Sequence, residues 1–319
     1  MSTLPSRSNR VELEGAFHLI TAASAAKSAN DSLEQSRGRG GSKPKRQYIT
    51  RVRVGIIASS LNDRQWRVLK DVARLGVISG THIERLHYDG SAAGSRLARK
   101  ELSGLVQLNV LARLERRIGG VRAGSAGHVY ALGLAGQRVL YPSRSRYRPP
   151  WTPRPSYLRH ALSVSELYVC LREAERGGGM TLITYDTEPH CWRHYSGPGG
   201  GRLSLKPDAF VITHVGNFED RYFVEADCST EPGTRIRAKA REYVRYWQSG
   251  REEGDDGVFP FVLWVAPNDA RATFLVESLA ALPAEDWKLF AIATQDDAAE
   301  RMAAGAYASI TNEREEVNL

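Results

Sequence analysis

Two short stretches decide the fold of the second half of the chain: Leu205–Phe210 (LKPDAF) and Tyr222–Thr230 (YFVEADCST). Each combines strand-forming apolar residues with carboxylates, which predicts strands that carry acidic groups at their ends. Successive side chains of a strand point to opposite faces, so Glu225 and Asp227 are expected to point the same way. The seventeen positions from Asp208 to Glu225 suit an antiparallel hairpin, which would bring all three carboxylates together.

Converging carboxylates repel one another unless a cation neutralises them. Hard oxygen ligands of this kind select Mg²⁺ or Mn²⁺, so Asp208, Glu225 and Asp227 are the predicted metal ligands and catalytic acids. Lys239, on the helix expected to follow, is the predicted catalytic cation, and Tyr243 lies four residues further along the same helical face. Each element also has a purely structural interpretation: the Pro-Asp pair as a turn, the Glu-x-Asp strand as a solvated face and Lys239 as a surface residue. The metal-site hypothesis therefore depends on the order of these elements taken together.

The segments around these stretches predict a mixed sheet flanked by helices over residues 157–295. Helices are expected at 157–176, 232–249 and 270–282, and strands at 181–185, 206–213, 221–227, 259–266 and 289–294. Residues 296–319 are expected to be a tail that begins as helix and then loses regular structure.

Residues 54–142 are predicted to form a winged helix-turn-helix, in which three short helices precede a hairpin. Asn62 or Asp63 can cap the first helix, and Gly76 ends it. The helices begin near Leu61, Ser79 and Ser91, the third has Leu97, Leu102 and Leu105 facing inward, and the strands span 108–116 and 128–134.

The helix opened by Ser91 is the one expected in the major groove of DNA. Its polar face offers hydroxyl, guanidinium and ammonium groups that suit base edges and phosphates, supplied by Ser95, Arg96, Arg99 and Lys100. The hairpin is expected to touch the DNA backbone or minor groove through Arg113, Arg116, Arg117 and Arg122. A protein-binding winged helix with an exposed basic face is the alternative.

Charge is distributed unevenly along the 319 residues. The formal balance is +6 over residues 1–53, +10 over 54–148 and −8 over 149–319. Residues 1–53 lack sustained periodicity and are expected to form a disordered basic arm, which either adds phosphate contacts or is an inert tail. Residues 143–156, rich in proline and arginine, predict a stiff linker at the point where the charge reverses. Double-stranded DNA is the partner that this distribution predicts.

Cysteine and hydropathy patterns exclude several classes of protein. The three cysteines form no C-x-x-C pair, which argues against a disulfide framework or a cysteine zinc site. His190-Cys191 and His194 lack a fourth zinc partner, so a loop between strands is expected there. No apolar run reaches the length of a membrane span and no signal-peptide core is present, so a reduced, cytoplasmic protein without membrane contact is expected.

Together these residues resemble the PD-(D/E)xK restriction-endonuclease-like nucleases. From about Leu61 to Leu282 the chain more closely resembles the replication-relaxation family of mobile elements, which is related to the MOBC class of conjugative relaxases. The residues that carry the resemblance are Pro207-Asp208, Glu225-Ala-Asp227 with Thr230, and Lys239 with Tyr243. The resemblance implies a winged helix followed by a nuclease-like domain, with Glu166 as an accessory metal-binding acid.

The family resemblance also implies binding at a plasmid or integrative-element origin and metal-dependent nicking of one strand, without tyrosine-linked chemistry. One departure is that Asp227 occupies the lysine position of the nuclease motif, so Lys239 would supply that charge from the helix. A relaxase-like nickase is therefore the leading hypothesis. A catalytically inactive DNA-binding replication or transcription factor is the second, and a scaffold that recruits replication or conjugation proteins is the third. A homodimer is among the expected assemblies.

Overall fold

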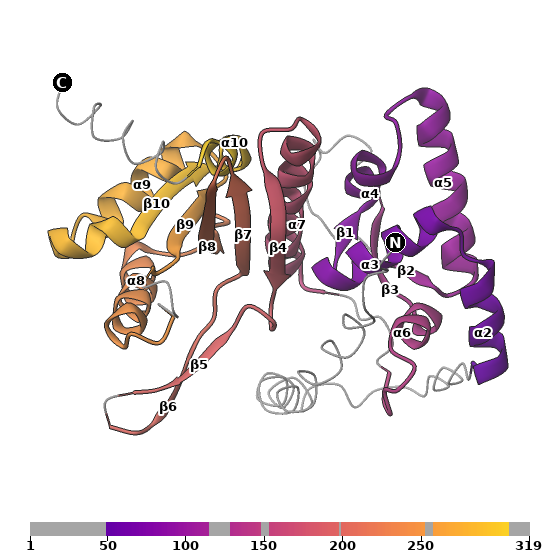
Figure 1. The fold of residues 1–319 in the computed structure, drawn as a ribbon, viewed down its shortest axis with the longest axis horizontal. Helices are drawn as coiled ribbons and strands as arrows, with labels where there is room; N and C mark the ends of the chain where they lie inside the picture. Colours follow the sequence, from indigo (N-terminus) through magenta and orange to yellow (C-terminus); the bar gives the residue numbers. More distant parts are fainter. Residues whose placement is uncertain (1–48, 115–127, 148–152, 198, 253–257, 306–319) are drawn as a thin grey trace, which may run out of the picture. The chain divides into compact units, whose positions relative to one another are not determined.

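The computed structural model describes residues 49–114, 128–147, 153–197, 199–252 and 258–305 (Figure 1). These residues belong to one compact unit, Ile49–Leu319. Most of the predicted basic arm, residues 1–48, lies outside the described residues, as does 306–319 of the predicted tail. Among the helices that the structure describes, none combines the length and the apolar character that crossing a bilayer requires.

The first half of the described chain is mostly helical. They are α2 (Arg51–Ser60), α3 (Asp63–Leu75), α4 (Gly80–His87), α5 (Ala92–Gln107) and α6 (Leu134–Leu140). Asn62 forms a reciprocal capping box with Gln65 at the start of α3, while Ser79 and Ser91 cap α4 and α5. Gly76 ends α3 at a positive φ of 72°, which glycine adopts without steric cost. These caps confirm the helix starts predicted from the sequence.

A small antiparallel sheet packs beside these helices. Its strands are β1 (Ile78–Ser79), β2 (Leu111–Leu114) and β3 (Val129–Leu132), in the order β1-β3-β2. Helices α3 to α5 followed by the β2–β3 pair are the elements that a winged helix requires. The tip of the hairpin, residues 115–127, lies outside the described residues, so the wing with Arg116, Arg117 and Arg122 stays a prediction.

The second half has a five-stranded mixed sheet flanked by helices, as predicted. The strands are β4 (Thr181–Thr187), β7 (Ala209–Val215), β8 (Phe218–Ala226), β9 (Phe261–Ala266) and β10 (Phe290–Thr294), in the order β10-β9-β8-β7-β4. Pairing is antiparallel for β4–β7 and β7–β8 and parallel for β8–β9 and β9–β10. The antiparallel β7–β8 hairpin confirms the pairing expected from the Asp208–Glu225 spacing.

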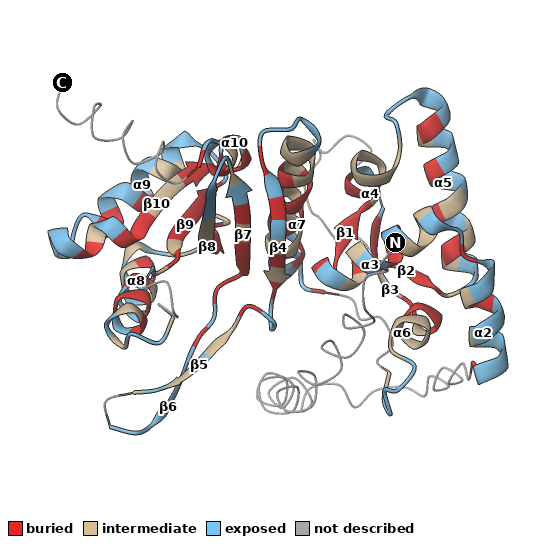
Figure 2. Cartoon of the chain, in the orientation of Figure 1, coloured by how far each residue is buried: buried red, intermediate tan, exposed pale blue. Residues whose placement is uncertain are grey.

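Helices cover both faces of this sheet. α7 (Pro155–Arg176) and α10 (Ala298–Ala304) pack on one face, where Val211, Val224 and Val265 are buried. α8 (Gly233–Gln248) and α9 (Asp269–Leu279) pack on the other, against Phe223 and Trp264. A 3₁₀ helix, η4 (Ala284–Leu289), precedes β10. Figure 2 shows β7 and β9 buried along most of their length, which agrees with a sheet covered on both sides.

Hydrogen bonds and a shared core connect the two halves. Val72, Ile83 and Leu105 belong to the same apolar cluster as Leu167 and Leu171 of α7. Ser165 Oγ donates to Val77 O (2.7 Å), Thr187 Oγ1 donates to Arg74 O (2.6 Å), and the Tyr168 hydroxyl donates to Asp71 Oδ1 (2.9 Å). The small sheet and its helices are therefore attached to α7 and β4 by buried contacts.

Several expectations were wrong in detail. Helices α2 and α6 and strand β1 are not predicted by the sequence pattern. Leu97, expected to face inward, is 39% exposed, and Ala98 takes the buried position instead, because α5 buries Gly94, Ala98, Leu102 and Leu105 along one face. The segment 188–194, expected to be a loop, contains the start of a two-stranded ribbon, β5 (Arg193–Ser196) and β6 (Arg202–Leu205).

Candidate functional site

The candidate site lies where β7 begins and β8 ends. Asp208 precedes β7, its backbone N–H donates to Val224 O (3.0 Å), and its Oδ2 accepts the Ala226 N–H (2.8 Å). These two bonds extend the antiparallel pairing by one residue and place the Asp208 carboxylate beside the end of β8. Since Asp208 is only 8% exposed, its second oxygen needs a polar partner of its own.

His160 of α7 is that partner. Its Nε2 lies 3.2 Å from Asp208 Oδ1, and its Nδ1 lies 3.2 Å from Ala226 O. The hydrogen bond to Asp208, supported by one to Cys228, raises the pKa of His160 to about 11 against the effect of burial. Burial alone would raise the pKa of Asp208, but the positive charges of Lys239 and His160 lower it below the ordinary value.

Glu225, the last acidic residue within β8, is buried on the sheet face that α8 and α9 cover. The Tyr243 hydroxyl donates to its Oε1 (2.5 Å), and Lys239 forms an ion pair with its Oε2. Desolvation raises the pKa of Glu225 to about 8, although the charge of Lys239 opposes the rise. Burial opposes the charge of Lys239, but the carboxylates of Glu225 and Asp208 outweigh it and raise the pKa of the lysine.

Lys239 and Tyr243 reach Glu225 from one face of α8, as their i, i+4 spacing predicts. The Lys239 ammonium also lies 5.9 Å from the centre of the Trp264 ring of β9, within the range of a cation–π contact. Asp208 just before β7, Glu225 near the end of β8 and Lys239 on α8 are thus brought together at one end of two interior strands of the sheet.

Asp227 follows the last residue of β8, and its carboxylate is held by other partners than that of Glu225. Arg271 of α9 donates from Nε to Oδ1 (2.7 Å) and from Nη2 to Oδ2 (2.9 Å), while the Ser229 N–H also donates to Oδ1 (2.6 Å). The Asp227 side chain is 1% exposed. Both of its oxygens are therefore occupied by protein donors, in the bidentate geometry that favours arginine over lysine.

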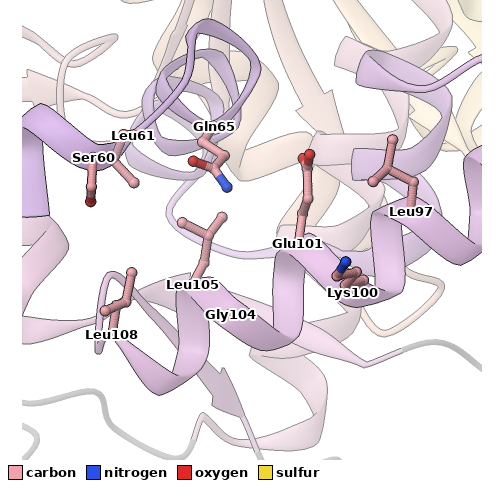
Figure 3. Close-up of a pocket in the computed structure, with 9 residues that line it drawn as sticks. All are labelled: Ser60, Leu61, Gln65, Leu97, Lys100, Glu101, Gly104, Leu105 and Leu108. Carbon is pink, nitrogen blue, oxygen red and sulfur yellow. The ribbon is translucent and has the colours of Figure 1, made fainter.

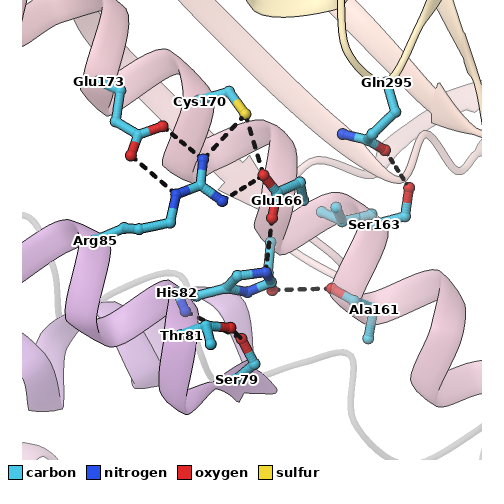
Figure 4. Close-up of polar contacts among 12 residues, drawn as sticks. Ser79, Thr81, His82, Arg85, Ala161, Ser163, Glu166, Cys170, Glu173 and Gln295 are labelled. Carbon is cyan, nitrogen blue, oxygen red and sulfur yellow. Dashed lines mark hydrogen bonds and ion pairs between the residues drawn. The ribbon is translucent and has the colours of Figure 1, made fainter. Parts of the chain in front are cut away.

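Glu166, proposed as an accessory acid, is not brought to this site. It lies on α7 and accepts from His82 Nε2 (2.8 Å) and Arg85 Nη1 (2.5 Å), both on α4 (Figure 4). The hydrogen bond from His82, together with that from Arg85, lowers the pKa of Glu166 to about 2, although burial opposes the change. Arg85 also makes two bonds to Glu173 (2.9 and 2.5 Å), so the cluster joins α4 to α7.

Another acid, Glu188, lies at the rim of the site. It follows β4, and Trp192 Nε1 donates to its Oε1 (3.0 Å). Partial desolvation and the negative charge of Asp208 raise the pKa of Glu188, while the hydrogen bond from Trp192 and the charges of His160 and Lys239 oppose the rise. This mutual influence places Glu188 in the same electrostatic cluster as Asp208 and Lys239.

The donor set fits a divalent cation in part. Among the described residues, no group of three His, Cys, Asp or Glu side chains is arranged to hold a metal ion. Asp208 and Glu225 supply two oxygen-bearing side chains, which suffices for Mg²⁺ because that ion keeps several waters and takes further oxygens from a phosphate. The residues that would hold it are therefore Asp208 and Glu225, whose oxygens already accept from His160, Tyr243 and Lys239, so a cation would share or displace these donors. Glu188 is a further acid of the same cluster.

The predicted DNA-reading face lies on α5. Arg96, Arg99 and Lys100 are exposed and share one helical face through their i, i+3 and i+4 spacing. The fourth predicted contact, Ser95, instead donates its hydroxyl to Glu84 of α4. Lys100 also lines a shallow groove of about 320 Å³ between α2, α3 and α5, together with Gln65, Leu97 and Leu108 among others (Figure 3).

Sequence reasoning missed three residues of the site: His160, Glu188 and Arg271. His160 and Arg271 lie far along the chain from their partners, and Arg271 is 44 residues from Asp227, whereas Glu188 bonds to nearby Trp192. In the sequence, each is a polar residue near the start of a predicted helix or just after a predicted strand. Many surface residues occupy such positions, so the sequence did not distinguish these three. Their roles depend on tertiary packing rather than on local pattern.

Comparisons with known proteins identify the family of the chain. The model of the replication-relaxation family matches residues 69–262. A solved structure, protein VC1899 from Vibrio cholerae, is similar at 10% identity over 80% of this chain and 55% of that chain, with a TM-score of 0.24, so the chain spans little more than half of that protein. No curated protein matches the chain. Since the family match covers more than half of the chain, including Asp208, Glu225 and Lys239, the protein belongs to the replication-relaxation family.

Proposed function

We propose that the protein nicks one strand of duplex DNA at the origin of a plasmid or integrative element, in a reaction that requires Mg²⁺ or Mn²⁺. The observation that carries the proposal is the convergence of Asp208, Glu225 and Lys239 where β7 begins and β8 ends. Two carboxylates beside a lysine are the groups that metal-assisted phosphodiester hydrolysis needs. In that reaction, water oxygen bonds to phosphorus and one P–O bond breaks, which leaves a phosphate end and a hydroxyl end.

Each side chain has a role that follows from its contacts. Asp208 and Glu225 would hold the cation; when bound, it supplies positive charge against the phosphate and makes water a better nucleophile. Lys239, already 26% exposed beside Glu225, would stabilise negative charge on the phosphate oxygens. His160 fixes the orientation of Asp208 through its Nε2.

Helix α5 would recognise the origin by contacting its DNA. Arg96, Arg99 and Lys100 present three cations on one exposed face, and the +10 balance of residues 54–148 favours a polyanionic partner. The contacts between α4 and α7 attach this face to the helix that carries His160. In this proposal, the winged-helix half binds the origin sequence and the half with the five-stranded sheet cuts the DNA strand.

The test is relaxation of supercoiled plasmid that carries the native origin, with Mn²⁺ or with EDTA. Open circles are expected for the wild type with Mn²⁺ and not with EDTA, and Asp208→Asn and Glu225→Gln should abolish them. The matched control is Glu219→Gln, an exposed carboxylate at the opposite end of β8, which should nick as the wild type does. Binding of the origin without any metal-dependent nicking would overturn the nickase proposal.

A second candidate is a DNA-binding replication or transcription factor without catalytic activity. The observation that favours it is that two cations already neutralise the acids: Lys239 pairs with Glu225, and His160 pairs with Asp208. A site with its charges satisfied does not need a metal for stability. Under this alternative, Asp208→Asn would leave origin binding intact, and no plasmid would be nicked at any Mn²⁺ concentration.

A further inference from the structure

The β5–β6 ribbon differs in composition from the rest of the acidic half of the chain. Residues 149–319 carry a balance of −8, yet residues 189–206 contain Arg193, Arg202 and Lys206 and no aspartate or glutamate. Figure 1 shows β5 and β6 extending away from the five-stranded sheet as a separate two-stranded ribbon. The lack of acidic residues in this ribbon, within an otherwise acidic half of the chain, suggests that the ribbon contacts a negatively charged partner.

One face of the ribbon is docked on the protein. Arg193 pairs with Glu252 (2.9 Å) and stacks over Phe210, with its guanidinium carbon 4.4 Å from the ring centre. The Tyr195 ring packs on Tyr246 at 4.9 Å between centres, and Leu205 is buried. These contacts fix the ribbon in place, so its other face is held in a defined orientation.

The opposite face is open. Strand alternation and the pairing His194↔Ser204 and Ser196↔Arg202 put these four residues on that face, and all four are exposed. Just beyond the ladder, Lys206 is also exposed and its Nζ lies 4.3 Å from the centre of the Trp192 ring. The open face thus combines two cations with hydroxyl and imidazole groups, and Lys206 lies over the partly buried Trp192 ring. Glu188, which accepts the Trp192 N–H, is an acid at the base of the ribbon.

The base of the ribbon adjoins the candidate site. β4 leads into the ribbon and β6 leads out of it, and only Lys206 and Pro207 separate β6 from Asp208. Thr187, at the end of β4, pairs with Ala209 at the start of β7. A ligand that followed the open face toward Lys206 would therefore arrive at the Asp208 carboxylate.

We infer that the open face of the β5–β6 ribbon binds the sugar–phosphate backbone of the DNA that enters the Asp208–Glu225 site. Arg202 and Lys206 lie four residues apart, which is about 13 Å along an extended strand. The same distance covers about four nucleotides along one strand of duplex DNA, at ~3.4 Å each. The cations match the phosphates in charge, and hydroxyl and imidazole groups are common hydrogen-bond partners of phosphate oxygens. This inference rests on the proposed function in taking DNA as the ligand of the site, but backbone binding by the ribbon does not require cleavage.

The test measures binding of a fluorescent 30-base-pair duplex of mixed sequence to the full chain carrying Asp208→Asn, without metal, over a series of salt concentrations. Adding Arg202→Gln and Lys206→Gln should reduce the slope of log K against log salt by about 2, since each phosphate contact contributes about 0.9. The control pair, Lys288→Gln and Arg301→Gln, removes the same charge from exposed positions on η4 and α10 and should leave the slope unchanged.

A photo-crosslinking amino acid locates the contact independently of affinity. Placed at Ser196 on the open face it should crosslink to the duplex, whereas at the exposed Phe218, at the far end of β8, it should not. An unchanged salt slope, or equal crosslinking from both positions, would overturn the ribbon inference while leaving the nickase proposal intact. A reduced slope in a protein that never nicks its origin supports the ribbon and overturns only the nickase.

Discussion

His160 Nε2 lies 3.2 Å from Asp208 Oδ1, and the Nδ1 of the same ring lies 3.2 Å from Ala226 O. A carboxylate and a carbonyl oxygen both accept hydrogen bonds, so both ring nitrogens carry protons and the imidazole is positively charged. The ring therefore anchors the start of β7 to the end of β8 through one residue of α7. This arrangement makes a prediction about stability that is separate from any catalytic role.

His160→Gln should destabilise the protein by about 1.5–3 kcal/mol at pH 6, the range for hydrogen bonds to charged groups. The pKa of His160 is raised from 6.5 to about 11 in the folded state, so this stabilisation is fully present below the unfolded pKa and is lost as the pH rises toward 11. Urea unfolding of wild type and variant at pH 6, 8 and 10 should show a shrinking difference. His194→Gln, at an exposed histidine of the ribbon, should cost less than about 0.5 kcal/mol. A difference that stays constant with pH would contradict the charged-ring assignment.

The pair of Lys239 and Glu225 predicts that replacing the lysine destabilises the protein more as the pH rises, whereas the effect of replacing His160 shrinks. With its pKa raised to about 8, Glu225 stabilises the fold fully below its unfolded pKa near 4.5 and loses that contribution as the pH rises through 8. Lys239→Met removes the cation that offsets ionisation of this buried carboxyl. The variant should therefore be mildly destabilised at pH 5 and by about 3–5 kcal/mol at pH 9.

Chemical unfolding of Lys239→Met between pH 5 and 9 tests this expectation. The double variant Lys239→Met with Glu225→Gln lacks the ionisable carboxyl and should lose the additional destabilisation at high pH. Lys206→Met, which removes an exposed lysine, provides the control for the loss of charge. Equal destabilisation of Lys239→Met at pH 5 and pH 9 would mean that Glu225 does not ionise in this range.

Local sequence pattern predicted much of the fold and the centre of the site. Capping residues marked the starts of α3, α4 and α5, and short β-rich or apolar runs bounded by turn residues marked the strands of the main sheet. Asp208, Glu225 and Lys239 could be placed together because a hairpin and the helix that follows it are short-range relations, which spacing describes well.

The parts that spacing could not predict depend on contacts made elsewhere. Helix α2 buries only Ile57 and leaves Val52 and Ile56 exposed, so its sequence has no amphipathic period to detect. The ribbon strands are four residues each and meet across a Gly-rich segment, which reads as loop in sequence. The pairing of Asp227 with Arg271 crosses 44 residues, so Asp227 looked free to bind a metal when only its own strand was considered.

Arg271 should be essential to stability because Asp227 is almost fully enclosed. Arg271→Ala would leave a buried carboxylate without its bidentate partner, at a cost of about 3–5 kcal/mol, and Arg271→Lys should recover only part of this because an ammonium does not match two oxygens at once. Thermal or urea unfolding provides the measurement, and Arg235→Ala, whose side chain is 72% exposed, is the control. If Arg271→Ala unfolds at the wild-type midpoint, Asp227 is not held as described.

The last prediction concerns recognition by α5. Arg96→Ala and Arg99→Ala should each weaken origin binding by about 1–3 kcal/mol where the lost contact is to a base, and the loss should be smaller on a scrambled duplex. A contact to phosphate would instead weaken both duplexes alike and reduce the salt slope by about 1. Fluorescence anisotropy with the two duplexes at several salt concentrations separates these cases, with Lys288→Ala as the control. Wild-type affinity for both duplexes in the Arg96→Ala/Arg99→Ala double variant would place the groove-reading surface on another element.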